Sequence, residues 1–178
     1  VVQIGIGGSD LGPRALYLAL KNYALDANSE KMKAYFISNV DPDDANDVLS
    51  QIGNLESTLF ILVSKSGDTP ETLANYELIK KKLEEKHIDD AKKHFVAVTS
   101  KTSGLAKSCD FFKKFYMDDF IGGRYSSTSS VGGLVLSLAF GYPYFKELLK
   151  GAYEADVNAQ IPDIQKNAAM MDALIGVY

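Results

Sequence analysis

The sequence predicts an α/β fold, a three-layer αβα sandwich around a five-stranded parallel doubly wound sheet of order 2-1-3-4-5, with a C-terminal helical extension. Short apolar runs alternate with helical segments, which is the pattern of parallel strands joined by crossover helices. The run at 58–63 is almost wholly apolar, as expected for a central strand covered on both faces. Polar turns follow the first and third runs, which are neighbours in a sheet of this order.

Each expected element has a local signal. The expected strands occupy residues 1–6, 32–38, 58–63, 95–99 and 111–117. Pro13 opens the first helix, because the missing N–H of proline costs nothing in a first turn. Asp41 caps the second helix, with Pro42 as its first residue. Thr69 caps the third in the same way, with Pro70 following.

The last third of the chain is expected to be helical. A Gly/Ser-rich loop over 119–130 precedes a nearly all-apolar helix. We divide the chain into a domain at 1–142 and a helical extension at 143–178, broken near Gly151 and Pro162 because both residue types weaken helices. Both ends of the chain lie in apolar sequence, so we expect a piece of a longer protein whose second domain is absent.

The composition of the chain restricts the classes of partner and site that it can have. Of the 178 residues, 46% are hydrophobic and 24% charged, and the net charge of -4 comes without a long run of one sign. This balance gives no support to a nucleic-acid or membrane-surface partner. Cys109 is the one cysteine, which excludes an internal disulfide and fits a reducing cytosol; we expect it to be at least half-buried. Two histidines and one cysteine at unrelated spacings make no metal-ligand pattern.

The first polar turn, 5–13, reads Gly-Ile-Gly-Gly-Ser-Asp-Leu-Gly-Pro. Its glycines let the backbone approach a ligand closely, and the start of the following helix attracts anions. The spacing is not the dinucleotide fingerprint, since no glycine stands three residues after Gly7 and the end of the second strand carries Ser38-Asn39 in place of an acid. A tight turn without a ligand is the alternative.

The second polar turn, 64–72, reads Ser-Lys-Ser-Gly-Asp-Thr-Pro-Glu-Thr. Hydroxyl groups, one lysine and the backbone N–H groups around Gly67 suit a phosphate at the entry to a helix. A helix cap is the alternative, but a cap needs one hydroxyl and this turn offers three. The lysine precedes the glycine, so the pattern is not that of a Walker loop.

A third segment, 119–132, places paired glycines before Arg124. A guanidinium can stabilise an oxyanion or hold a phosphate; an arginine on a flexible linker is the alternative. The first two turns follow neighbouring strands, so they flank the switch point where doubly wound sheets bind ligands.

Together these segments resemble the glucose-6-phosphate isomerase family. Residues 119–132 match its first signature at every constrained position, including Gly-Gly-Arg-Tyr-Ser at 122–126; residues 5–13 match its glycine turn. Ser64-Lys65 and Glu71-Thr72 match its phosphate loop. The resemblance covers most of the chain, from Val1 to about residue 140. The family has Thr, a bulky residue and Thr where this sequence has Ser-Gly-Asp at 66–68, a variant similar to the general sugar-isomerase (SIS) domain.

The resemblance implies a flavodoxin-like SIS fold and an activity. The family interconverts glucose 6-phosphate and fructose 6-phosphate through a cis-enediol(ate), in the cytoplasm, as a homodimer, without metal or organic cofactor. Arg124 would stabilise the enediolate. The residues that would bind the phosphate or the sugar are Gly8, Ser9, Ser64, Lys65, Ser66, Thr69 and Gly123. The family's general base has no counterpart here, so we expect the chain alone to be inactive.

Other functions remain open. A non-catalytic sugar-phosphate sensor would share the fold, although the arginine signature argues against it. An amino-sugar-phosphate isomerase domain is supported only by the variant at 66–68, and a purely structural or partner-binding role has no positive support. We expect His87 and His94 to be structural or solvated, and Glu71 to serve the helix start, not as a base.

Overall fold

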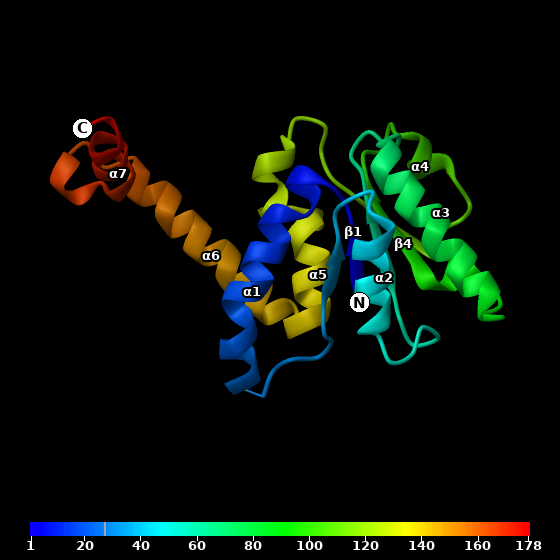
Figure 1. Cartoon of the computed structure of the whole chain (residues 1–178). Coiled ribbons are helices and arrows are strands. Elements are labelled where there is room, and N and C mark those ends of the chain that lie inside the picture. Colours follow the sequence, from blue (N-terminus) through cyan, green and yellow to red (C-terminus); the bar gives the residue numbers. More distant parts are fainter. Residues whose placement is uncertain (27) are drawn as a thin grey trace. The chain divides into compact units, whose positions relative to one another are not determined.

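The computed structural model describes residues 1–26 and 28–178. Two compact units are present, Val1–Tyr142 and Pro143–Tyr178. The first unit contains a five-stranded sheet of order β2-β1-β3-β4-β5, in which every pairing is parallel. Helices cover both faces of this sheet (Figure 1). The predicted fold class and strand order are confirmed.

The strands are shorter than the apolar runs that predicted them. They are β1 (Val2–Ile4), β2 (Tyr35–Ile37), β3 (Phe60–Val63), β4 (Phe95–Thr99) and β5 (Lys113–Tyr116). Only β4 has its predicted bounds. In the central register Val2 lies between Tyr35 and Phe60, so β1 and β3 leave the sheet side by side.

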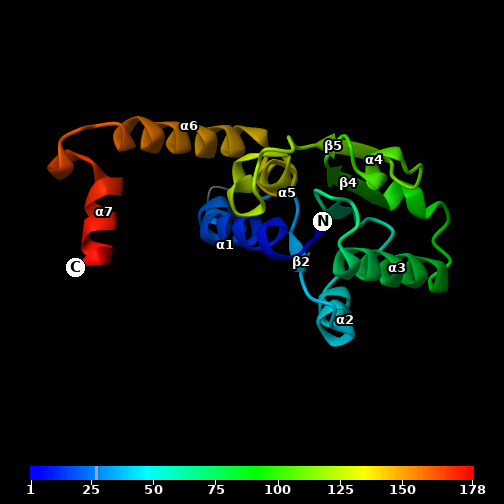
Figure 2. The same cartoon turned by 90° about the horizontal axis from the view of Figure 1, so that it is seen from above.

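Each face of the sheet carries its own helices. Figure 2 shows α1 (Leu11–Asp26) and α5 (Ser130–Phe140) together on one face, with α2 (Pro42–Ser50) and α3 (Pro70–Glu85) on the other. Short helices, α4 (Gly104–Lys107) and η2 (Ala91–His94), complete the connections. On the face of α1, Tyr17 stacks on Phe140 with ring centroids 5.3 Å apart.

A hydrophobic core lies under α2 and α3. Val2 and Ile4 point into it from β1, and neither is exposed. Four aromatic rings gather at its centre: the Phe95 ring lies 5.3 Å from Phe60 and 4.8 Å from Tyr76, and Tyr76 lies 5.7 Å from Phe111. Val2 and Ile4 share this face because successive side chains of a β-strand point to opposite faces of the sheet.

The helix starts follow the sequence signals in part. Asp41 caps α2, its side chain accepting from the backbone N–H of Asp43 at 2.9 Å. Thr69 occupies the cap position of α3, but its hydroxyl makes no capping bond. Helix α1 begins at Leu11, two residues before the predicted start at Pro13. Proline fits there because the first four N–H groups of a helix have no intrahelical partner.

The second unit is helical. It comprises most of α6 (Tyr142–Ala159), the short η4 (Ile164–Lys166) and α7 (Ala168–Val177). The predicted break near Pro162 is present, but the predicted break near Gly151 is wrong because α6 runs through it. One glycine costs a helix only about 1 kcal/mol relative to alanine, which a long helix tolerates.

Asn167 joins the two helices of this unit. Its amide donates to the carbonyls of Ala159 and Ile161, and its oxygen accepts from the backbone N–H of Met170 at 2.9 Å. In the described part of the chain, no helix combines the length and the apolarity that crossing a membrane would demand.

Replacing Phe95 with alanine should destabilise the domain. The side chain is fully buried between two other rings, and truncating such a phenylalanine typically costs about 3–5 kcal/mol. The free energy of unfolding, measured by denaturant titration, tests this. Phe112→Ala is the control, because Phe112 is 67% exposed and should change stability by no more than about 0.5 kcal/mol. Equal losses in both variants would contradict the predicted core.

The buried phenol of Tyr76 should lower the free energy of unfolding at alkaline pH. Burial raises the pKa of this phenol from its ordinary value of 10.0 to about 12. The unfolded chain therefore releases this proton before the folded chain does, and the free energy of unfolding falls as pH rises from 10 to 12.

In Tyr76→Phe the free energy of unfolding should fall less steeply with pH. Melting temperatures across this pH range measure the difference, with Tyr153→Phe as the control because Tyr153 is 67% exposed. An unchanged slope in Tyr76→Phe would show that other groups govern it.

Candidate functional site

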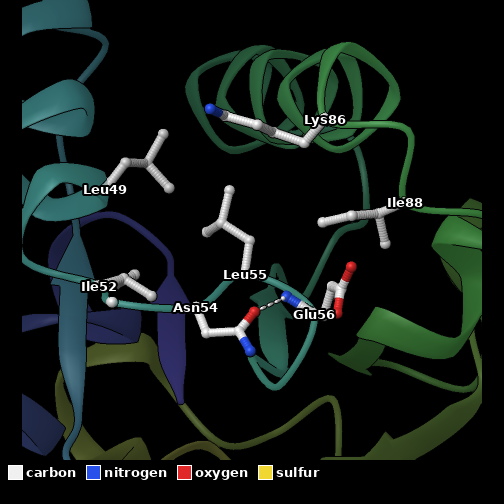
Figure 3. Close-up of a pocket in the computed structure, with 8 residues that line it drawn as sticks. Leu49, Ile52, Asn54, Leu55, Glu56, Lys86 and Ile88 are labelled. Atoms are coloured by element: carbon white, nitrogen blue, oxygen red, sulfur yellow. Dashed lines mark hydrogen bonds between the residues drawn. The ribbon is translucent and has the colours of Figure 1, made fainter.

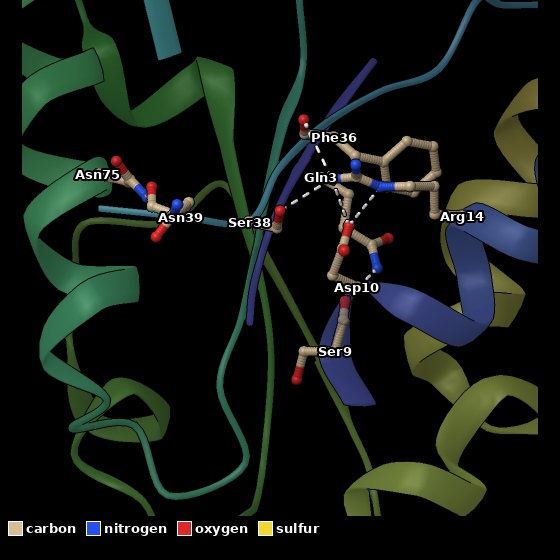
Figure 4. A network of polar contacts seen from close by, with 8 residues as sticks. All are labelled: Gln3, Ser9, Asp10, Arg14, Phe36, Ser38, Asn39 and Asn75. Atoms are coloured by element: carbon tan, nitrogen blue, oxygen red, sulfur yellow. Dashed lines mark hydrogen bonds and ion pairs between the residues drawn. The ribbon is translucent and has the colours of Figure 1, made fainter. Parts of the chain in front are cut away.

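The first polar turn forms a short helix, η1 (Gly7–Ser9), that leads from β1 into α1. Figure 4 shows Ser9 and Asp10 close to Gln3 of β1. The buried Gln3 side chain donates from Nε2 to the carbonyl oxygen of Ser9 at 2.7 Å. The strand itself therefore fixes the end of the turn that carries Gly8 and Ser9.

An ion pair ties this turn to the end of β2. Arg14 donates from Nε to Asp10 Oδ1 at 2.9 Å and from Nη2 to Ser38 Oγ at 3.0 Å (Figure 4). Its guanidinium also lies 5.4 Å from the centre of the Phe36 ring. Burial raises the pKa of the Asp10 carboxyl, and the neighbouring Arg14 opposes that rise. Neither residue was predicted as part of the site from the sequence, although an acid four residues before an arginine at a helix start is a known pairing signal.

The second polar turn holds itself in shape. Ser64 is buried, and its Oγ lies 2.8 Å from Thr69 Oγ1 and accepts from the backbone N–H of Gly67 at 3.0 Å. Gly67 has φ +81, and a Cβ there would lie 2.9 Å from Ser103 Cβ, so both backbone conformation and space require glycine. Ser66 is exposed and its Oγ accepts one long bond, 3.4 Å, from Asp68 N.

Thr72, in the first turn of α3, is 2% exposed. Its hydroxyl is buried and has no hydrogen-bond partner among the described residues. A buried hydroxyl left without a partner is unfavourable by about 1–3 kcal/mol. Sequence reasoning read this residue only as part of a matching motif; its helix position did not show that its hydroxyl would be unpaired.

Lys65 connects the second turn to the third segment. Its amino group donates to the backbone oxygens of Asp119 and Ile121, at 3.1 and 3.0 Å. Its own carbonyl oxygen accepts from the backbone N–H of Ser100 at 3.1 Å. The lysine is therefore held both at its backbone and at its amino group.

The third segment packs against the first. It contains a short helix, η3 (Gly123–Thr128), where we expected only loop. A Cβ on Gly8 would overlap the carbonyl group of Gly123. Ser126 Oγ donates to the Gly123 oxygen at 2.7 Å and lies 3.4 Å from the Gly8 oxygen. Arg124 is exposed, and no described residue pairs with its guanidinium.

All three segments therefore meet at the carboxyl edge of the sheet, next to β1 and β3. Among the described residues, no group of three or more acidic, histidine or cysteine side chains could hold a metal ion. What the segments do bring together is two cations, several hydroxyl groups and the start of a long helix. That combination suits a phosphorylated ligand.

The other candidate residues lie elsewhere. His94 makes a 3.0 Å bond from Nδ1 to the Thr58 oxygen, and His87 is exposed at the end of α3, as we expected. Cys109 is exposed, so the expectation that it would be at least half-buried is wrong. It lies in the connection between α4 and β5, outside the packed layers.

A cavity of about 460 Å³ opens at the other end of the sheet (Figure 3). It lies between the end of α2, the segment before β3 and the end of α3. Its lining residues are Leu49, Ile52, Gly53, Asn54, Leu55, Glu56, Lys86 and Ile88. These residues lie in the last turn of α2, in the segment before β3 or just after α3, so the cavity is separate from the three segments.

The fold and site define a class, a doubly wound α/β domain with polar turns meeting at its switch point. The family model for phosphoglucose isomerase matches residues 1–178, so the chain belongs to the phosphoglucose isomerase family. A protein of Treponema denticola named glucose-6-phosphate isomerase is 61% identical across the whole chain. A protein of Borreliella burgdorferi with the same name is 50% identical over 179 residues, again covering the whole chain.

Solved structures agree. A crystal structure of a glucose-6-phosphate isomerase from Chlamydia trachomatis matches 99% of the chain with a TM-score of 0.90 and 45% identity. A hypothetical protein from Thermus thermophilus matches 98% with a TM-score of 0.78 and 30% identity. The chain spans 33% of the Treponema denticola protein, 33% of the Chlamydia trachomatis chain and 40% of the Thermus thermophilus chain. It thus corresponds to about a third of the curated relatives it matches.

Gly8→Ala should destabilise the site. The added methyl group would overlap the Gly123 carbonyl, and forcing atoms into such a contact typically costs about 1–3 kcal/mol. Gly53→Ala is the control, because Gly53 has no neighbouring heavy atom within 4 Å of an added Cβ and no positive φ. Denaturant titration should separate the two variants; equal stabilities would mean that the turns do not pack this closely.

Proposed function

We propose that this chain is the sugar-phosphate-binding part of a glucose-6-phosphate isomerase, which interconverts glucose 6-phosphate and fructose 6-phosphate in glycolysis and gluconeogenesis. The observation that carries the proposal is the meeting of the glycine turn, the hydroxyl turn and the Arg124 segment at one sheet edge. The names of relatives 46–61% identical to the chain favour this function over the sensor and amino-sugar alternatives.

The phosphate is proposed to bind at the start of α3. Ser66 offers an exposed hydroxyl, and the helix start offers backbone N–H groups. Lys65 adds positive charge, and one of its three N–H donors remains after its two backbone bonds. Ser64 and Thr69 bond to each other and thereby shape the turn. Their mutual bond uses one of the two hydroxyl hydrogens, so the other can be donated to the phosphate.

The sugar is proposed to lie between the phosphate and Arg124. Gly8 and Gly123 form the floor, where the absence of a side chain on Gly8 lets the two turns pack directly against each other. Ser9 is half-buried beside them and offers a hydroxyl to the sugar. Arg124, exposed and unpaired among the described residues, stabilises the negative charge that develops on the enediolate oxygen.

The reaction moves a proton between C2 and C1 of the substrate, so it needs a base and no net redox chemistry. Glu71 stands in the first turn of α3, where it complements the helix dipole. We propose that the base comes from a part of the longer enzyme outside these 178 residues. We also propose that residues 1–142 form the SIS domain, that 143–178 lead to a second one, and that the enzyme is a cytoplasmic homodimer.

The 178-residue chain should bind sugar phosphate without turning it over. Fructose 6-phosphate should raise its melting temperature, because a ligand that binds only the folded state stabilises it, whereas fructose should not. A coupled assay should detect no glucose 6-phosphate from the chain alone and ready formation from the longer enzyme. The absence of a shift with every sugar phosphate, together with an inactive longer enzyme, would refute the proposal.

Thr72→Val should stabilise the chain. Valine has the shape of threonine without the buried, unpaired hydroxyl, so the melting temperature should rise by about 2–4 °C if about 1 kcal/mol is recovered.

Thr72→Ser is the matched control, because it keeps the unpaired hydroxyl and should not gain stability. Thermal unfolding of the two variants and the wild type measures the difference. A Thr72→Val variant that melts no higher than the wild type would show that the hydroxyl is not left unpaired in the folded chain.

A further inference from the structure

Lys65 makes an unusual link between two of the three segments. Its backbone is fixed where the turn after β3 meets the turn after β4, with the Lys65 oxygen accepting from Ser100 N at 3.1 Å. Its amino group then crosses to the Arg124 segment, and its two hydrogen bonds there go to backbone oxygens. The lysine therefore holds the path of the chain in that segment without depending on any side chain of it.

The backbone that leads to Arg124 is held at two places. Before it, Lys65 binds the oxygens of Asp119 and Ile121. Immediately before Arg124, the Gly123 oxygen accepts from Ser126 Oγ at 2.7 Å and packs against Gly8. The guanidinium itself has no partner among the described residues. The backbone is thus fixed while the functional end is left available for a ligand.

We infer that Lys65 is a positioning residue for Arg124, in addition to any charge that it offers to the phosphate. The inference rests on the proposed function and adds a coupling within the site. An ammonium has three donors, and two are committed to the Arg124 segment. A phosphate oxygen that takes the third joins phosphate binding to the placement of Arg124.

Two roles for Lys65 predict different kinetics. A lysine that only binds phosphate contributes equally to the substrate and the transition state, so its loss raises KM with kcat unchanged. A lysine that positions Arg124 acts when charge develops on the substrate, so its loss lowers kcat. Misplacing a catalytic group by about 1 Å can cost on the order of a hundredfold in rate.

The first experiment measures kcat and KM of the longer enzyme carrying Lys65→Met, which keeps an unbranched side chain and removes the donors. We expect kcat to fall by about ten- to a hundredfold and to fall by a larger factor than KM rises. Lys101→Met is the control, since Lys101 is exposed in the neighbouring turn after β4 and loses the same charge. A variant in which only KM changes, or a control that loses as much kcat, would overturn the inference.

The second experiment is a double-mutant cycle with Arg124→Ala. If Lys65 acts through Arg124, Lys65→Met should change kcat by less than about threefold once Arg124 is gone, because residues in one network are not additive. A phosphorylated hydroxamate that mimics the enediolate should lose more affinity in Lys65→Met than fructose 6-phosphate does. Independent, additive losses would mean that Lys65 does not act through Arg124.

A third measurement does not depend on turnover. Amide hydrogen exchange in the longer enzyme should speed up at Ile121 and Tyr125, whose N–H groups bond to the oxygens of Asp118 and Gly122, when Lys65 is replaced by methionine. Lys101→Met should leave both unchanged. If the wild-type enzyme fails to isomerise sugar phosphates, the proposed function fails; if exchange at these two amides is unchanged by Lys65→Met, the positioning role fails.

Discussion

Parallel pairing of β1 with β3 is the constraint on which the site depends. Ile4, the last residue of β1, lies opposite Leu62, one residue before the end of β3, so the turns that follow the two strands leave the sheet at one edge. A strand inserted between them would separate the turns by about another 4.8 Å per strand, beyond the contacts seen here. The link from Lys65 to the Arg124 segment and the packing of Gly8 on Gly123 both require this adjacency.

Within the site, polar groups divide into those used by the fold and those left available. Ser64 and Thr69 bond to each other, and Asp10 bonds to Arg14. These pairs set the shape of their turns, and removing one member would leave the other unpaired. Ser66, Thr72 and Arg124 have little or no such engagement. A ligand can therefore be accommodated without breaking the bonds that build the turns.

The sequence was enough to predict the fold and the sheet edge at which the polar turns meet, because both follow from short-range patterns. Alternating apolar runs gave the sheet, and glycine, hydroxyl and arginine clusters marked the three segments. It was not enough for the contacts between segments. The bond from Lys65 to Ile121 joins residues 56 positions apart, and no local pattern encodes such a partner. Nor could composition distinguish the paired hydroxyl of Ser64 from the unpaired one of Thr72, since that depends on three-dimensional neighbours.

The two lysine bonds have an electrostatic consequence. Lys65 and Arg124 take part in none of the ion pairs between described residues, and the oxygens that Lys65 contacts are uncharged backbone carbonyls. Neither positive charge is neutralised by an ion pair, although the chain carries a net charge of -4. Two cations without ion-pair partners favour an anion at this edge over the rest of the acidic chain. Mobile ions screen such fields over about 8–10 Å, so this attraction weakens as ionic strength rises.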